Sequence, residues 1–335
     1  MVKIRAPGKV ILLGEHSVVY DKLGIAGAFD KYIEVIVEPG KNGLKINRDL
    51  QYPGFTRTKE ELFDLLKKFR EMYENKDFDA IKELEFKDAI AIVVADVLDK
   101  YGYMDVEISI NLKKSVQGVG QSASIFASIA LGITKLLGKD ISKKEIADLA
   151  YIGDVVAHAG TPSGIDTSAV TYGGYVQYKK SLGVKKLDVE FELPLVLVDS
   201  GKPGQTAVTV PHVRKQREEN PARVDEILDN LDKIAVWALE CLGKKDTDKL
   251  GSLMYDFYDE LKKLDISTPE LDKIIEIARE NRFLGAKPTG GWGGGACIII
   301  ARNQEELDKI SKVYEDAGFS TLIAGIGVDG VEVIG

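Results

Sequence analysis

The stretch from Lys113 to Leu137, KKSVQGVGQSASIFASIALGITKLL, constrains the fold of this chain more than any other. Two glycines, Gly118 and Gly120, precede small hydroxyl residues and then about four turns of apolar, helix-compatible sequence. We therefore expect a flexible loop that leads into the N-terminus of a buried helix. The first N–H groups of a helix lack internal partners and its dipole is positive there, so such a loop can hold a phosphate if glycines let it come close.

The residues alone leave two interpretations of this loop open. A Gly-x-Gly before a helix is also a common tight turn, and neither G-x-x-x-x-G-K-[ST] nor G-x-G-x-x-G is present. In the phosphate interpretation, Ser122 would add a hydroxyl ligand for a phosphate-bound Mg²⁺.

The composition is that of a globular protein, because 44% of the residues are hydrophobic and 29% are charged. The length of 335 residues is enough for two domains. No apolar run approaches the roughly eighteen residues of a membrane span, and Gly14, Glu15 and His16 interrupt the apolar N-terminal segment where a secretory signal would continue. We expect a cytoplasmic protein without a membrane partner.

Charge and cysteine content exclude further classes of function. The net charge of −8 argues against a nucleic-acid partner, but it allows a phosphate ligand held by local backbone donors. Cys241 and Cys297 are the two cysteines, and there are three histidines. Neither a disulfide framework nor a Cys/His zinc site is expected.

The N-terminal segment from Lys3 to Tyr20 reads as a strand, a turn at Pro7-Gly8, and then the apolar run VILLG. Lys9 lies among apolar residues, so it is either a strand lysine whose amine reaches solvent or a cation that points into a cleft. Glu15 and His16 are likewise either a structural hydrogen-bonded pair or part of a site.

The first half of the chain alternates strands and helices, which predicts an α/β arrangement. Thr58 with Glu61, and Ser142 with Glu145, are capping boxes that start helices. The expected elements are a strand over Tyr32–Val37, a helix from Thr58, a helix over Phe86–Tyr101, a strand over Asp105–Leu112, a helix from Ser142 to about Val156 and an edge strand over Tyr172–Tyr178.

The segment HAGTPSGIDT, from His158 to Thr167, is expected to be a loop. Asp166 is either an Asx-turn or helix-cap residue, or a carboxylate at a loop tip that acts as a base toward a substrate hydroxyl. In the second interpretation Ser163 is a positioning donor.

The second half begins with a buried strand and ends in an α+β arrangement. Within Gly285 to Ala301, five glycines surround Trp292. Ordering so many glycines costs much chain entropy, which favours a backbone that approaches a ligand closely over an ordinary turn. The other expected elements are a strand over Leu195–Asp199, a glycine-containing loop over Gly201–Gln216, helices over Pro221–Cys241, Lys249–Leu264, Thr268–Asn281 and Gln304–Ala317, a strand over Ala296–Ala301, and two short strands at the end.

Three segments together resemble the motifs of the GHMP kinase superfamily: APGKVILLGEH at Ala6–His16, GVGQSAS at Gly118–Ser124 and GGWGGGA at Gly290–Ala296. Within it, PGKVILLGEHSVVY, TPSGIDT and DISTPELD are most similar to mevalonate kinases of the archaeal type. The resemblance covers Ala6 to about Ile299 and matches least over Thr58–Asp77. It implies an α+β, two-domain fold, with an α/β domain like ribosomal protein S5 over residues 1–182 and a ferredoxin-like α+β domain over 183–335.

The resemblance also implies a role for individual residues. Lys9 matches the lysine beside the reacting hydroxyl, and Asp166 matches the aspartate taken as the base. ATP would be bound by the loop residues Gly118, Gly120, Gln121, Ser122, Ala123 and Ser124. The acceptor substrate would be contacted by Glu15, His16, Ser163, Thr206, Gly291 and Trp292.

Several positions depart from the family pattern. Gln121 stands where the loop usually has a serine, Ser115 replaces a proline, and Trp292 alters the last glycine motif. The Mg²⁺-binding glutamate of mevalonate kinases is absent from its usual position. Asp154 is the nearest acid, and it lies about one residue further from Asp166 than the glutamate does in the family. We expect Ser122 and Asp154 to bind Mg²⁺; the alternative is that Asp154 is a solvated acid on a helix face.

The implied activity is ATP-dependent phosphorylation of mevalonate to 5-phosphomevalonate, a step of isoprenoid precursor biosynthesis. Two related acceptors stay open, a mevalonate already phosphorylated on its 3-hydroxyl and 5-phosphomevalonate. A regulator that binds nucleotide and metabolite without catalysis is a further alternative, and a homodimer is left open.

Overall fold

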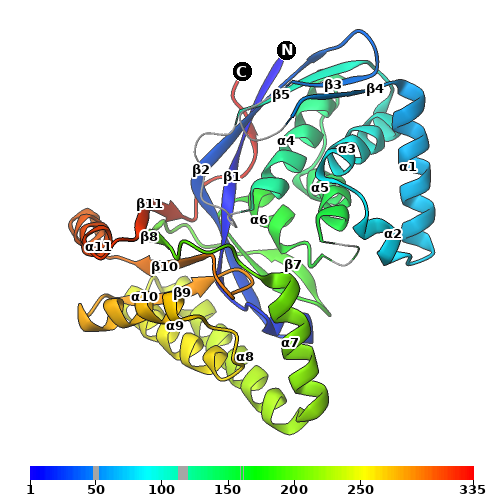
Figure 1. Ribbon diagram of the computed structural model, residues 1–335. Helices are drawn as coiled ribbons and strands as arrows, with labels where there is room; N and C mark the ends of the chain where they lie inside the picture. Colours follow the sequence, from blue (N-terminus) through cyan, green and yellow to red (C-terminus); the bar gives the residue numbers. More distant parts are fainter. Residues whose placement is uncertain (48–52, 112–119, 159, 161) are drawn as a thin grey trace.

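The computed structural model describes residues 1–47, 53–111, 120–158, 160 and 162–335, and its strands form one mixed sheet flanked by helices (Figure 1). The order along the main path of the sheet is β4-β3-β5-β2-β11-β8-β10-β9. The described strands are β1 Val2–Leu13, β2 Gly24–Pro39, β3 Leu44–Ile46, β4 Phe55–Arg57, β5 Val106–Asn111, β6 Tyr175–Lys179, β7 Gly183–Lys186, β8 Leu193–Asp199, β9 Gly285–Thr289, β10 Ala296–Ile300, β11 Ser320–Ile326 and β12 Glu332–Val333.

The helices lie in two groups, α1 to α6 with the N-terminal half of the chain and α7 to α11 with the C-terminal half. Their bounds are η1 Ser17–Tyr20, α1 Lys59–Glu74, α2 Phe78–Lys82, α3 Phe86–Tyr101, α4 Gln121–Leu136, α5 Lys143–Ala157, α6 Ile165–Tyr172, α7 Thr206–Glu219, α8 Pro221–Lys244, α9 Thr247–Lys262, α10 Pro269–Glu280 and α11 Gln304–Asp316. Within these described ranges, no helix is long and apolar enough to cross a membrane.

Strands β1 and β2 are long and antiparallel, paired from Val2 opposite Val37 to Leu13 opposite Ile25. The turn predicted at Pro7-Gly8 is wrong, because the chain continues through this point in one strand with a shift of register between the two residues. Proline has no N–H to give to the ladder, and a bulge accommodates that loss without ending the strand.

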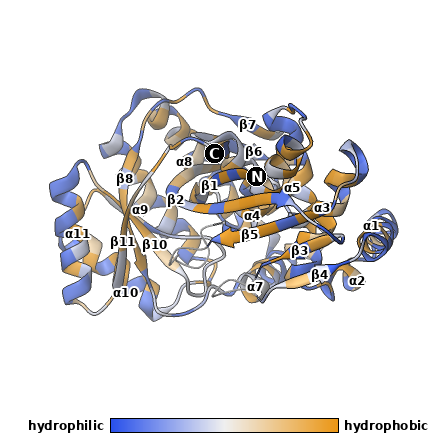
Figure 2. Ribbon diagram, turned by 90° about the horizontal axis from the view of Figure 1, so that it is seen from above, coloured by the Kyte–Doolittle hydropathy of each residue, from blue (hydrophilic) through white to orange (hydrophobic). Residues whose placement is uncertain are grey.

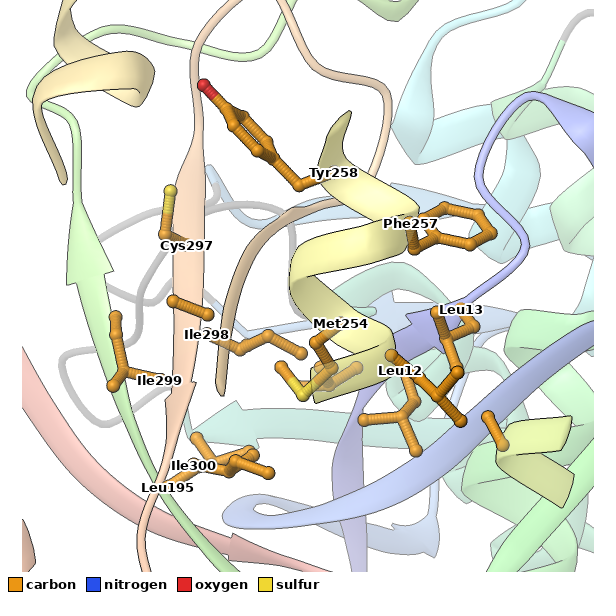
Figure 3. Packing of buried hydrophobic residues seen from close by; sticks show 14 of the residues in the cluster. Leu12, Leu13, Leu195, Met254, Phe257, Tyr258, Cys297, Ile298, Ile299 and Ile300 are labelled. Atoms are coloured by element: carbon orange, nitrogen blue, oxygen red, sulfur yellow. The ribbon is translucent and has the colours of Figure 1, made fainter. Parts of the chain in front are cut away.

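These two strands contribute side chains to two separate hydrophobic cores. Ile4, Ala6 and Val35 belong to the core under α1, α3, α4 and α5, whereas Val10 and Leu13 belong to the core formed with the C-terminal half. In Figure 3, Leu12 and Leu13 lie against Met254 and Phe257 of α9, with Ile298 to Ile300 of β10 beyond them. Lys9 therefore lies at the point on β1 where one core gives way to the other.

The helical group of the N-terminal half follows its sequence signals closely. Thr58 and Ser142 cap α1 and α5, each in a capping box with a glutamate three residues on, as predicted. The helix over Phe86–Tyr101 is confirmed as α3, and the apolar stretch after Gly120 as α4. Figure 2 shows α1 with mixed polar and apolar residues at the edge of the molecule and the apolar strands β2 and β5 further in.

Other predictions of local structure are wrong. The segment around Asp166 is not a loop tip but the first turn of α6, and β6 is not an edge strand because β2 and β7 flank it. Residues 206–216 of the predicted loop form most of α7, and β9 and the short α2 were not predicted.

The end of the chain returns to its beginning. Strand β12 pairs with β1 through Ile4 opposite Val333, and the N–H of Lys3 donates to the carbonyl of Gly335 (Figure 1). The predicted division into residues 1–182 and 183–335 stays a prediction. The two parts share one sheet, because β11 and β12 of the second part pair with β2 and β1 of the first.

Candidate active site

Lys9 and Asp166 form an ion pair between the middle of β1 and the first turn of α6. Lys9 Nζ lies 3.0 Å from Asp166 Oδ1, and the two side chains are 7% and 18% exposed. Gly164 adopts the left-handed conformation, with φ of +78°, directly before α6 begins. The carboxylate therefore lies at the N-terminal end of a helix and beside a cation.

The N-terminus of α4 packs against Lys9. Gly120 precedes the helix with φ of +77°, and a β-carbon at this position would lie 2.6 Å from Lys9 Cγ. The hydroxyl of Ser124 donates to the carbonyl of Pro7 at 2.6 Å, which fastens the helix to β1 two residues from Lys9. Gln121 and Ser122 are half-buried and Ala123 is buried. Gly118 lies outside the described residues, so its predicted contact stays a prediction.

Asp154 lies on α5 and is fully buried, with 1% of its side chain exposed. The alternative of a solvated acid is therefore wrong. His158 Nδ1 lies 3.3 Å from Asp154 Oδ1 and 3.1 Å from the backbone oxygen of the same residue. The Asp154 carboxylate raises the pKa of His158 to about 9, so the imidazole is a cation at neutral pH. Burial raises the pKa of Asp154, and the charges of Lys9 and Asp166 also act on it, which places it beside the ion pair.

The far end of β1 is joined to the last glycine motif. His16 Nε2 lies 3.0 Å from the carbonyl oxygen of Gly291, which also accepts a hydrogen bond of 2.6 Å from Thr209 Oγ1. A carbonyl is only an acceptor, so His16 carries its proton on Nε2. Burial lowers the pKa of His16 to about 4, which keeps the ring neutral.

A buried ion pair accompanies this contact. Lys287 of β9 is 0% exposed, and its Nζ lies 2.5 Å from Oε1 of Glu15, which is 1% exposed. Sequence reasoning did not single out Lys287. The available signal was a lone lysine among uncharged residues in the short strand GAKPT, directly before the last glycine motif.

The remaining predicted residues lie around the last glycine motif and α6. A β-carbon at Gly291 would lie 1.8 Å from Thr206 Oγ1, so glycine is required where the motif meets the start of α7. Trp292 is fully buried and stacks on Tyr258 with ring centroids 5.8 Å apart, so its indole belongs to the core of the C-terminal half. Ser163 Oγ accepts a hydrogen bond from the N–H of Ile165 at 3.3 Å.

Strand β1 thus connects two groups of predicted residues. Lys9, at its middle, lies with Asp166 and Gly120, and Asp154 is within electrostatic reach. Beyond the end of the strand, Glu15 and His16 contact Lys287 and Gly291.

Comparison with known proteins identifies the family and the fold of the chain. The model of the GHMP kinases N terminal domain matches residues 88–174, and that of GHMP kinases C terminal matches residues 235–318. The mevalonate kinase of Thermococcus gammatolerans is 32% identical over 338 residues, which cover 98% of this chain and 97% of the relative. The mevalonate kinase of Methanocaldococcus jannaschii is 32% identical over 325 residues, or 92% of this chain and 94% of the relative.

Solved structures show the same fold over the full length. The crystal structure of L. major mevalonate kinase in complex with R-mevalonate has a TM-score of 0.77 and 27% identity, with 98% of this chain and 97% of that one covered. The Lactococcus lactis galactokinase complexed with galactose, at 17% identity and a TM-score of 0.74 over 99% of this chain and 94% of that one, shares the fold. Motifs, fold and full-length relatives agree, and the chain belongs to the GHMP kinase family of small-molecule kinases, which use ATP.

Proposed function

We propose that this protein transfers the γ-phosphoryl group of ATP to the 5-hydroxyl of mevalonate and so forms 5-phosphomevalonate. The observation that carries the proposal is the Lys9–Asp166 pair, 3.0 Å apart and beside the N-terminus of α4. The named mevalonate kinases among its full-length relatives support this choice of acceptor.

Positioning and electrostatics account for most catalysis of phosphoryl transfer, because the transition state is loose and rich in charge. The backbone N–H groups at the start of α4, from Gln121 to Ala123, would bind the phosphates of ATP. The N–H of Ser124 does not take part, because it donates to the carbonyl of Gly120 within the helix. Lys9 Nζ would neutralise charge that develops on the transferred group. Asp166 would accept or orient the proton of the acceptor hydroxyl, and its pairing with Lys9 fixes the carboxylate for this role.

The side chains near this point are of the kind that Mg²⁺ prefers. Oδ1 of Asp154 is buried and receives no hydrogen bond from the part of the chain that the structure describes, although His158 lies beside it. Such an oxygen suits a hard cation, and Ser122 offers a hydroxyl oxygen at the start of α4. Ser122 and Asp154 would hold the ion, which when bound would neutralise the charge of the ATP phosphates.

The acceptor would lie along the path from Lys9 to the last glycine motif. It would be contacted by the residues to which the resemblance gives this role: Glu15, His16, Ser163, Thr206 and Gly291. Trp292 would contact the acceptor only through its backbone, because its indole is packed in the core.

A coupled ADP-release assay on three acceptors in parallel tests the proposal: mevalonate, mevalonate 3-phosphate and 5-phosphomevalonate. We expect mevalonate to have the highest kcat/KM, with the Asp166→Asn variant as the inactive control. Preference for a phosphorylated acceptor would make the protein a kinase of that compound. Calorimetric binding of ATP and mevalonate without any ADP release would instead indicate a non-catalytic regulator.

A further inference from the structure

Lys287 is a fully buried lysine whose ammonium has two acceptors. Its Nζ donates to Glu15 Oε1 at 2.5 Å and to the backbone carbonyl of Pro288 at 2.6 Å. A buried charge is tolerated only where it is paired and hydrogen-bonded, so this position requires the Glu15 carboxylate. The pair joins the end of β1 to β9, two segments that are 272 residues apart in the sequence.

The second oxygen of Glu15 is buried and lacks a donor. Within the ranges that the structure describes, no group donates a hydrogen bond to Oε2. A buried carboxylate oxygen without a donor is costly, and the attraction of Lys287 to Oε1 offsets only part of that cost. A donor from a bound ligand would remove this cost.

The position of this oxygen fits the acceptor side of the site. Lys9 acts electrostatically on Glu15, and the following residue, His16, is bonded to Gly291 of the last glycine motif. Thr289 Oγ1 donates to the carbonyl of Ile11 at 3.0 Å, so β9 is fastened to β1 on the other side of Lys287 as well. The carboxylate is therefore held rigidly between the catalytic pair and the glycine motif.

We propose that Lys287 is a positioning residue, which holds Glu15 by Oε1 so that Oε2 accepts a hydrogen bond from the acceptor hydroxyl that is not phosphorylated. This inference rests on the proposed function, in which the 5-hydroxyl of mevalonate lies at Lys9 and Asp166. The remaining hydroxyl of mevalonate is the 3-hydroxyl. A phosphoryl group at that position would meet a carboxylate, and the like charges would repel.

The ligand that tests this inference is 5-hydroxy-3-methylpentanoate, which is mevalonate without its 3-hydroxyl. Calorimetry in the absence of nucleotide would give the ratio of its dissociation constant to that of mevalonate. We expect a ratio of about ten or more for the wild-type protein, the size of a hydrogen bond to a charged group. In Lys287→Met the ratio should fall below about three, because the hydrogen bond to the 3-hydroxyl is lost.

Two further variants separate positioning from folding. Glu15→Gln with Lys287→Met removes both buried charges and should fold even where the single variant does not, and its ratio should equal that of Glu15→Gln alone. Lys143→Met is the control for loss of a lysine that donates to two backbone carbonyls, those of Thr171 and Val331. Lys143 is more exposed than Lys287, and among the residues that the structure describes no hydrogen bond or ion pair joins it to Glu15 or to the Lys9–Asp166 pair. This variant should keep the wild-type ratio.

The pH dependence of the steady-state KM gives a second test of the role of Lys287. Burial raises the pKa of Glu15 and Lys287 opposes this rise, so its removal shifts the ionisation of Glu15 to higher pH. In Lys287→Met the KM for the acceptor should therefore fall as pH rises, with the KM for ATP unchanged. A wild-type ratio in a folded Lys287→Met, or an equal rise of both KM values, would overturn the inference. If the wild-type protein phosphorylates another acceptor and not mevalonate, the proposed function fails by itself, and the variants are compared with that acceptor.

Discussion

The α-carbon of Gly120 faces the aliphatic part of Lys9 so closely that a β-carbon there would overlap Lys9 Cγ, at 2.6 Å. Gly120→Ala should therefore displace Lys9 from Asp166 and lower kcat at least about tenfold, since small displacements of reacting groups have large effects on rate. Steady-state kinetics with saturating ATP and acceptor would measure this.

Gly138→Ala is the matched control for that prediction. Gly138 also has positive φ, +69°, but a β-carbon there would meet no atom within 4 Å. Both variants carry the backbone strain of about 1 kcal/mol, so both should lower the melting temperature. Equal loss of kcat in the two variants would show that the Gly120 effect is one of stability and not of contact with Lys9.

Removal of either member of the Lys9–Asp166 pair should abolish most turnover. Asp166→Asn keeps the shape of the side chain but loses the base, and kcat should fall by about 10²- to 10⁴-fold. Lys9→Met keeps the buried stem and loses the cation, with a fall of similar order. Circular dichroism should show an intact fold in both. Near-full turnover in both variants would refute the assigned roles.

Asp154→Asn should raise the Mg²⁺ concentration needed for half-maximal rate. The amide keeps the volume of the buried side chain but lacks the charge that a divalent cation needs. Titration of the rate with Mg²⁺ at fixed ATP would measure the shift. An unchanged Mg²⁺ dependence would place the metal on Ser122, water and ATP alone.

His16 should make the protein less stable in mild acid. Its pKa is about 4 in the folded state against an ordinary value of 6.5, so the unfolded chain binds the proton more readily. The stability from the neutral ring is present above pH 6.5 and is lost as pH falls toward 4, by at most about 3 kcal/mol.

Urea unfolding between pH 4 and 7 would test this. His16→Gln keeps a donor toward Gly291 but does not titrate, so the difference in unfolding free energy between wild type and variant should shrink as pH falls. A difference that is constant over this range would contradict the prediction.

Local signals predicted much of the fold, because they act within a few residues. The capping boxes at Thr58 and Ser142 each need only a glutamate three residues on, and both were read correctly. The turn predicted at Pro7-Gly8 failed because pairing with β2 extends the strand through a bulge, a tertiary effect. Thr-Pro-Ser-Gly is typical of turns and predicts a loop around Asp166, yet the helix begins directly after it.

The candidate site was predictable as a set of residues, but its contacts were not. Lys9 and Asp166 were singled out separately, and their pairing depends on how α6 packs beside β1. Lys287 was missed because its partner, Glu15, is at the other end of the chain. The resemblance implies that Trp292 contacts the acceptor, but its indole stacks on Tyr258 in the core of the C-terminal half. Such choices depend on packing between distant segments, which no local pattern encodes.

The position of Lys9 between the two cores has a consequence for how the enzyme could enclose its substrates. Ala6 on one side of Lys9 is packed in one core and Val10 on the other side is packed in the second, with β2 crossing the same boundary beside them. A hinge between the halves would have to break or twist the paired strands β1 and β2 at Lys9 itself. We therefore expect the segments around β1 to move when the protein closes around its substrates. The strand itself would stay fixed and keep Lys9 in place.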